Sequence, residues 1–269
     1  MKKYIIANWK MQPVTTREAE DVFDGIQKSA PKLKNTEIVV CPPFVYLDAL
    51  SKKLKSYPPE ARLAKGGKLK VKLGAQDFFW ENPPKGGSYT GEISVSMLKD
   101  FGIRYAIVGH SEERDYLNVT DEMINKKIKT ALKAGIKIIF CAGEKERDED
   151  GAYLKFIKKE IHEGLSKISK KDMENLIIAY EPIWAISSSK DAKADTPENL
   201  FEMSIYIRRV LFFKFGRKVS KETSILYGGS VDAKNARDFL EKGNVQGLLV
   251  GRASWKEKSF IDLLKSIKI

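Results

Sequence analysis

The stretch Tyr105–Glu112, with the sequence YAIVGHSE, shows the pattern that decides the fold of this chain of 269 residues. The run Tyr105–Gly109 contains no charged side chain, which is typical of a parallel strand buried on both faces. Three polar residues, His110, Ser111 and Glu112, follow directly where such a strand would end. A short apolar strand that leads through polar residues into a helix is the pattern of a βα unit.

The same pattern recurs along the chain. Eight apolar runs are strand candidates: Tyr4–Asn8, Glu37–Cys41, Lys70–Gly74, Tyr105–Gly109, Lys137–Cys141, Leu176–Tyr180, Ser224–Tyr227 and Gly247–Val250. Helical patterns lie between them: Arg17–Lys28, Thr120–Ala134, Ala152–Ile168, Glu198–Phe215, Ala233–Lys242 and Trp255–Ile267. Eight βα units over roughly 250 residues match a closed barrel, so we predict an α/β fold, with a single (β/α)8 barrel domain over residues 1–269. A doubly wound open sheet is the alternative, but no GxGxxG turn follows the first strand.

The composition excludes several classes of protein. Hydrophobic residues make up 42% and charged residues 31% of the chain, which excludes an intrinsically disordered chain. No apolar run approaches the ~18 residues of a membrane span, and the N-terminal residues turn polar too early for a secretory signal. With only two histidines, and two cysteines that have no CxxC partner, we expect no disulfide framework, no metal site and a cytoplasmic location.

The charge of the chain is strongly positive, with a formal net charge of +12. The densest group of lysines falls in an irregular stretch, residues 51–70, which we expect to be a long basic surface connection before the third strand. Because no aromatic residues interleave with these lysines, the stretch resembles a solvated face more than a nucleic-acid site. A positive field would also favour an anionic, phosphorylated substrate.

Polar residues stand at the ends of predicted strands, where the chemistry of a (β/α)8 barrel is found. The first strand ends in Asn8 and Lys10, and a buried lysine requires an anion. The fourth leads into His110 at a helix start, where the helix dipole keeps an imidazole neutral and able to donate a hydrogen bond to a carbonyl. The sixth ends in Glu181, whose burial beside Trp184 would raise its pKa toward that of a general base. Taken singly, each also has an ordinary structural interpretation: a turn, a hydrogen-bonded histidine or an ion-paired glutamate.

The seventh and eighth predicted strands end in small residues. Ser230 follows two glycines, and Gly251 precedes Arg252. Backbone N–H groups at these two ends form the usual phosphate site of such a barrel. The candidate site thus combines a base, a neutral electrophile, a cation and a phosphate site, and the sequence has no Walker A or GxSxG motif. This combination predicts proton abstraction beside a carbonyl in a small phosphorylated substrate, without a cofactor.

Eight motifs carry a resemblance to a known family: Ala7–Met11 (ANWKM), Cys41–Pro43 (CPP), Gly74–Asp77 (GAQD), Tyr89–Ser94 (YTGEIS), Gly109–Glu112 (GHSE), Ala179–Ile186 (AYEPIWAI), Tyr227–Val231 (YGGSV) and Val250–Gly251 (VG). In this order and spacing, the chain resembles the triosephosphate isomerase family from Tyr4 to about Trp255. The resemblance implies interconversion of dihydroxyacetone phosphate and D-glyceraldehyde 3-phosphate, a glycolytic step.

The resemblance also implies roles for residues. Glu181 would move the carbon-bound proton, and neutral His110 would polarise the carbonyl. Lys10 would offset the negative charge, with Asn8 orienting the substrate and Glu112 supporting the lysine.

The remaining implied residues bind phosphate or a second subunit. Ser230 and the backbone N–H groups of Ser187, Gly251 and Arg252 would hold the phosphate. Residues 182–192 resemble the family's lid loop. Thr90 resembles the loop tip that enters the other subunit of the family's homodimer.

Three departures from the family pattern concern the lid tip, a charge and the phosphate site. The lid tip is Ser187–Lys190 (SSSK) where the family has Gly-Thr-Gly-Lys, and serine tolerates a positive φ much less than glycine does. Glu113 stands where the family has arginine, so a structural ion pair is in doubt. Arg252 stands where the family has glycine, and its side chain could crowd or strengthen the anion site.

Two other functions are compatible with such a barrel. One is a binding protein, for example for RNA, but a pure binder does not need Asn8, Lys10, His110 and Glu181. The other is an aldolase, which commonly needs a Schiff-base lysine or a metal inside the barrel, and Glu181 stands where that lysine would be sought.

Overall fold

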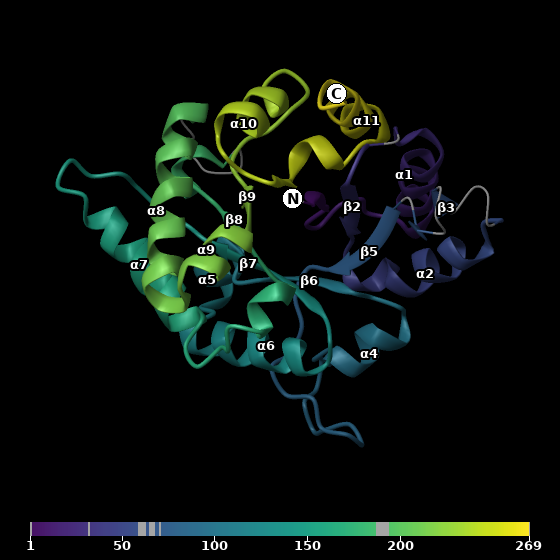
Figure 1. Ribbon diagram of the computed structural model, residues 1–269. Coiled ribbons are helices and arrows are strands. Elements are labelled where there is room, and N and C mark those ends of the chain that lie inside the picture. The colour runs from purple at the N-terminus through teal and green to yellow at the C-terminus, as the bar shows by residue number, and fades with distance from the viewer. Residues whose placement is uncertain are drawn as a thin grey trace.

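The barrel is closed by parallel strands, as predicted. The computed structural model describes residues 2–31, 33–58, 71–186 and 194–268, together with the backbone of residues 63–64 and 68–69. Within these residues, eight strands form the barrel (Figure 1): β1 (Lys3–Asn8), β2 (Thr36–Cys41), β5 (Val71–Ala75), β6 (Tyr105–Val108), β7 (Lys137–Ala142), β8 (Leu176–Tyr180), β9 (Ser224–Tyr227) and β10 (Gly247–Val250). They pair in chain order, and β10 closes the barrel by pairing with β1, Ile5 opposite Leu248.

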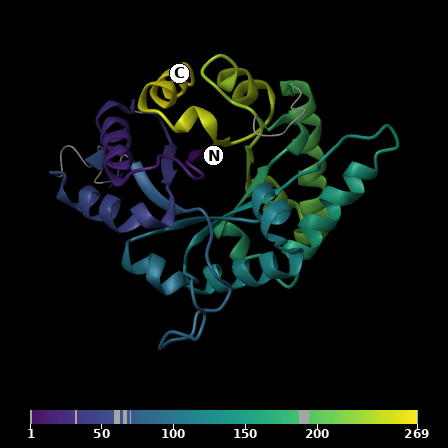
Figure 2. The same cartoon turned by 180° about the vertical axis from the view of Figure 1, so that it is seen from behind.

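Helices surround the strands in a ring, which is visible from both sides (Figures 1 and 2). Within the described residues, the α-helices are α1 (Thr16–Ser29), α2 (Leu47–Ser56), α4 (Val95–Asp100), α5 (Ser111–Leu117), α6 (Asp121–Lys133), α7 (Ala152–Gly164), α8 (Pro197–Phe215), α9 (Arg217–Glu222), α10 (Ala236–Lys242) and α11 (Glu257–Ser266). Short 3-10 turns are η1 (Phe44–Tyr46), η2 (Asp172–Asn175), η3 (Ile183–Ala185) and η4 (Arg252–Ser254). Among the described residues, no helix is both long and apolar enough to cross a membrane.

Several predicted boundaries were wrong. The third barrel strand is Val71–Ala75, one residue later than expected, and helix α7 ends at Gly164 and not at Ile168. The expected connection over residues 51–70 begins with the end of helix α2. It also contains a short antiparallel pair, β3 (Leu63–Ala64) and β4 (Lys68–Leu69), and its remaining residues from 59 to 70 lie outside the described residues.

Alternation along the strands divides the buried side chains into two layers, because successive side chains of a strand point to opposite faces. On β1, Ile5 and Ala7 belong to the large cluster that packs against the helices. The alternate residues of the strands fill the barrel interior: Tyr4, Ile6, Val39, Cys41, Tyr105, Ile107, Ile139, Cys141, Ile177, Ala179, Leu226 and Leu249. The interior is therefore a packed core, and a substrate must bind at the end of the barrel.

Side-chain caps mark several of the helix starts. The Thr15 hydroxyl accepts a hydrogen bond from the Glu18 N–H, and the Glu18 side chain accepts one from the Thr15 N–H. Thr196 caps α8 in front of Pro197, a residue well suited to the first helical position. Such caps satisfy N–H groups that have no partner within the helix, typically worth about 1 kcal/mol each.

Candidate active site

A cavity of about 630 Å³ lies at the C-terminal ends of the strands, among the loops that follow β1, β6, β8, β9 and β10. It is lined by seven of the predicted site residues: Asn8, Lys10, His110, Glu181, Ser230, Gly251 and Arg252. Segments far apart in the sequence therefore meet at one site, as the sequence predicts. Ser187 and residues 188–192 of the expected lid lie outside the described residues.

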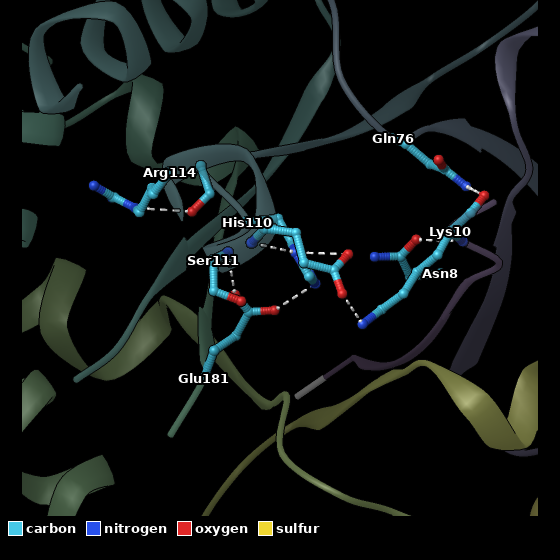
Figure 3. Close-up of polar contacts among 9 residues, drawn as sticks. Asn8, Lys10, Gln76, His110, Ser111, Arg114 and Glu181 are labelled. Atoms are coloured by element: carbon cyan, nitrogen blue, oxygen red, sulfur yellow. Dashed lines mark hydrogen bonds and ion pairs between the residues drawn. The ribbon is translucent and has the colours of Figure 1, made fainter. Parts of the chain in front are cut away.

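His110 and Glu181 face each other in this cavity (Figure 3). The Nε2 atom of His110 lies 3.2 Å from Oε1 of Glu181, and both side chains are buried. The second carboxylate oxygen of Glu181 accepts a hydrogen bond from the Ser111 N–H at 3.2 Å. The carboxylate therefore reaches from the end of β8 to the start of helix α5, whose first N–H groups favour negative charge.

The hydrogen bonds of His110 determine where its proton lies. His110 is the N-cap of α5, and its Nδ1 atom accepts a hydrogen bond from the Glu112 N–H at 3.2 Å. A ring nitrogen that accepts a hydrogen bond carries no proton, so the proton of the neutral ring is on Nε2. Nε2 is the atom that faces Glu181 and the cavity, and it is therefore a hydrogen-bond donor there.

Lys10 has a left-handed backbone that neighbouring side chains hold. Its φ of 54° is uncommon for a residue with a Cβ atom and costs of order 1 kcal/mol. Asn8 Oδ1 accepts a hydrogen bond from the Lys10 N–H at 3.0 Å, and Gln76 donates to the Lys10 carbonyl at 2.9 Å (Figure 3). The Lys10 ammonium pairs with Glu112 at 2.5 Å. Glu112 therefore lies beside the lysine for which it is expected to be a supporting carboxylate, and Gln76 is a neighbour of Lys10 that the sequence analysis missed.

Two glycines allow other chain segments to approach Glu181 closely. A Cβ atom on Gly143 would lie 1.8 Å from the Glu181 carbonyl oxygen. A Cβ atom on Gly228 would lie 2.8 Å from Cγ of Glu181. The loops after β7 and β9 therefore enclose Glu181 on opposite sides, which leaves the buried carboxylate few orientations.

Glu144 is a further residue that the sequence analysis missed. Its Oε1 atom accepts hydrogen bonds from the Tyr180 hydroxyl at 2.8 Å and the Trp184 indole N–H at 2.9 Å. Arg147 donates to the same oxygen at 3.2 Å. Tyr180 and Trp184 lie on either side of Glu181 in the sequence, so the buried Glu144 carboxylate holds the segment that carries Glu181 and leads into the expected lid. Its position after a strand, like that of Glu181, was an available signal.

The side of the cavity expected to bind phosphate is formed by the ends of β9 and β10. The Ser230 N–H donates to the Ala185 carbonyl at 3.1 Å and ties this loop to the segment after Glu181. Gly251 precedes η4, and the exposed Arg252 begins it. Lys256 also lines the cavity, and the sequence analysis missed it.

Thr90 lies apart from the cavity within this chain. It is exposed, in the loop between β5 and α4 that projects beyond the ring of helices (Figures 1 and 2). Its neighbour Tyr89 packs against Phe79, with ring centroids 4.7 Å apart, and is still 44% exposed. A role for Thr90 in the site would require a second copy of the chain.

Glu113, which stands where the family has arginine, lies near a buried lysine, Lys127. The buried Lys127 ammonium lies 2.6 Å from Asp77 and 3.7 Å from Glu113. Burial and the negative charge of Asp77 raise the pKa of Glu113 to about 7, while Lys127 acts in the opposite direction. Arg114, which matches the family, pairs with Asp121 at 2.6 Å and Glu160 at 3.2 Å.

Comparison with known proteins agrees with this geometry. The model of the triosephosphate isomerase family matches residues 3–267. Triosephosphate isomerase from Dictyoglomus thermophilum is 42% identical over 266 residues, which cover 98% of this chain and 99% of the relative. Those from Dictyoglomus turgidum and Alkaliphilus oremlandii are 41% and 40% identical, with the same coverage. The chain, with its closed barrel and its facing histidine and glutamate, belongs to the triosephosphate isomerase family.

Proposed function

We propose that this enzyme interconverts dihydroxyacetone phosphate and D-glyceraldehyde 3-phosphate through an enediolate, with Glu181 as the base and neutral His110 as the electrophile. It is an aldose–ketose isomerase. The observation that carries the assignment of roles is the contact between the Glu181 carboxylate and the proton-bearing Nε2 of His110, beside Lys10 in one cavity.

The first step would transfer a proton. Glu181 takes it from the carbon next to the substrate carbonyl, and the electron pair of the C–H bond forms the enediolate double bond. His110 Nε2–H donates a hydrogen bond to the carbonyl oxygen as negative charge develops there. Glu181 then returns the proton to the neighbouring carbon, while a proton moves between the two oxygens through His110. No atom or electron is gained or lost overall.

Substrate would replace contacts that the two side chains make with each other. Here Oε1 of Glu181 lies 3.2 Å from Nε2 of His110, and Oε2 accepts a hydrogen bond from the Ser111 N–H. A bound carbonyl oxygen would accept a hydrogen bond from His110 at this position, and the carboxylate would turn toward the reacting carbon. The buried carboxylate is then close to the carbon and shielded from water, which favours proton transfer.

The remaining residues would bind the anionic parts of the substrate. Lys10 supplies positive charge, and Asn8 holds its backbone and helps orient the substrate. Ser230, together with the backbone N–H groups of Gly251, Arg252 and Ser187, would bind the phosphate. Closure of a lid over residues 182–192 would protect the enediolate from water and from loss of phosphate.

We also propose a homodimer. Exposed apolar side chains gather in the loops after β1 and β2, where Met11 is 89%, Val14 79% and Val45 77% exposed. These loops lie together, because the Tyr46 hydroxyl donates to the Pro13 carbonyl at 2.9 Å. Burial against the projecting loop that carries Thr90 on a second copy would remove this apolar surface from water. The buried free cysteines, Cys41 and Cys141, are compatible with the proposed cytoplasmic location.

A coupled assay with D-glyceraldehyde 3-phosphate and chelated, metal-free protein tests the reaction. We expect rapid formation of dihydroxyacetone phosphate and loss of at least about 10³-fold in kcat in Glu181→Gln, which keeps the shape of the side chain but not the base. The exposed Glu149→Gln is the matched control and should leave kcat unchanged. Full activity in Glu181→Gln would refute the assignment of the base, and no activity in the wild type would refute the reaction.

A further inference from the structure

A second charged cavity, of about 550 Å³, lies at the opposite end of the barrel. It is formed where β1, β7, β8 and β9 begin, between η2 and α9. Because all barrel strands are parallel, this end faces away from the site that contains His110 and Glu181. The isomerase chemistry does not use it.

The charge of this cavity is strongly one-sided. Its cationic lining residues are Lys2, Lys137, Lys170, Lys171, Arg217 and Lys218. The lining residues include six cations and only two carboxylates, Glu174 and Glu222. The whole chain, by comparison, has 48 lysines and arginines and 36 aspartates and glutamates. Within the part of the chain that the structure describes, Lys2 alone of the six forms an ion pair, with Glu37 outside the cavity. The cavity therefore concentrates positive charge well beyond the average of the chain.

The positive groups come from both walls of the cavity. Lys170, next to η2, extends so far that its ammonium lies 3.9 Å from the Cβ position of Gly216, at the start of α9. Arg217 and Lys218 follow on that helix. Lys137, at the start of β7, is half-buried. Its ammonium donates to the Glu174 carbonyl at 3.3 Å and lies 5.8 Å from the centre of the Tyr4 ring. Burial and the nearby charge of Lys2 lower the pKa of Lys137.

Apolar side chains form the floor beneath these cations. Tyr4, Met173, Leu176 and Phe215 are buried and line the cavity. Such a site combines a mainly apolar wall with a few charged groups, which is the usual form of a small-molecule pocket. The cations suit phosphate oxygens, since ammonium and guanidinium groups bind phosphate through charge-assisted hydrogen bonds.

We propose that this cavity binds a small organic phosphate, with the phosphate at the Lys137, Lys170 and Lys218 groups and the organic part on the apolar floor. The bound anion would neutralise cations that no carboxylate now pairs. Since the cavity is formed by the starts of four barrel strands, the bound phosphate would stabilise the folded barrel, by an amount that increases with the logarithm of the ligand concentration above Kd.

Titration calorimetry of the full-length protein with phenyl phosphate at low ionic strength tests the proposal. We expect two binding events, one at each end of the barrel. Competitive inhibition of the isomerase identifies the event in the catalytic cavity. Inorganic phosphate should bind the second site at least about 10-fold more weakly, because it lacks the organic part.

Two variants assign the second event. Lys170→Ala/Lys218→Ala should weaken binding at the second site at least 10-fold and leave kcat, KM and the inhibition constant unchanged. Lys137→Met, which keeps a buried side chain of similar length but removes the charge, should have the same effects. The charge-matched control Lys133→Ala/Lys221→Ala removes two exposed lysines, one of them on α9, that do not line the cavity. The proposal would be overturned if Lys170→Ala/Lys218→Ala and the control bound phenyl phosphate equally well. It would also be overturned by a single binding event that competes with substrate, or by binding of an oligonucleotide without binding of any small phosphate.

Discussion

The Nε2 atom of His110 lies 3.2 Å from Oε1 of Glu181, although the two residues follow different strands, β6 and β8. The ring accepts a hydrogen bond at its other nitrogen from the Glu112 N–H, which leaves the proton on the atom that faces the carboxylate. The proposed donor for the substrate carbonyl and the proposed base for its carbon are thus side by side in the absence of substrate. Apart from the turn of the carboxylate toward the reacting carbon, little reorganisation would then be needed in the reaction.

Shortening the base should reduce turnover more than binding. Glu181→Asp keeps a carboxylate but withdraws it by about one methylene, and a misplacement of about 1 Å can cost 10²-fold in rate. We expect kcat to fall about 10²-fold with KM changed only a few-fold, measured in the coupled assay. An effect on kcat below about 3-fold would contradict the role of Glu181 as the base.

Replacing the electrophile should slow the reaction without unfolding the protein. His110→Gln cannot supply the same donor and cannot exchange a proton with the substrate oxygens. Loss of one donor to a developing oxyanion typically costs 10²–10³ in kcat, so we expect a fall of at least about 10²-fold. Circular dichroism should show intact secondary structure. Unchanged turnover would show that another group polarises the carbonyl.

Gln76 should act on the reaction through Lys10. Its side-chain amide donates to the carbonyl groups of Lys10 and Cys41, both at 2.9 Å. Gln76→Leu removes both bonds and frees the strained backbone of Lys10, so we expect kcat/KM to fall roughly 10-fold.

Rescue separates this positioning role from general destabilisation. Gln76→Glu retains acceptors but loses the two N–H donors, so it should fail to restore activity, whereas Gln76→Asn, which keeps the amide, should restore part of it. Equal kcat/KM in the wild type and in Gln76→Leu would contradict the role.

Glu113 should make stability depend on pH. Its pKa is about 7 in the folded protein, above the ordinary value of 4.5, so the folded state binds more protons between these values. The contribution of Glu113 to the free energy of unfolding is therefore fully present below about pH 4.5. It is lost as the pH rises through 7, and the loss is of order 2 kcal/mol. Glu113→Gln should lose less stability between pH 5 and pH 8 in urea unfolding than the wild type does.

The control for this experiment is the exposed Glu146→Gln. Glu160, whose pKa burial also raises to about 7, titrates in the same range in every variant and cancels in the comparison. If Glu113→Gln and Glu146→Gln show the same pH dependence, the buried group formed by Glu113, Asp77 and Lys127 does not contribute as inferred.

The sequence by itself determined the barrel and the residues that line the candidate site. Buried parallel strands such as Tyr105–Val108 read as apolar runs, and residues at their C-terminal ends converge, so the meeting of Lys10, His110 and Glu181 could be predicted. Boundaries were less accurate: the basic stretch contains the end of α2 and the pair β3–β4, where local patterns are weak.

Only the tertiary structure decided features that depend on contacts between distant segments. The proton position on His110 depends on one backbone N–H, and the left-handed backbone of Lys10 is held by Gln76, 66 residues away. Likewise, Glu113 finds Lys127 only because α5 and α6 pack near the end of β5. Sequence patterns record which side chains are buried, but the partner of a buried polar group is set by the packing of other segments around it.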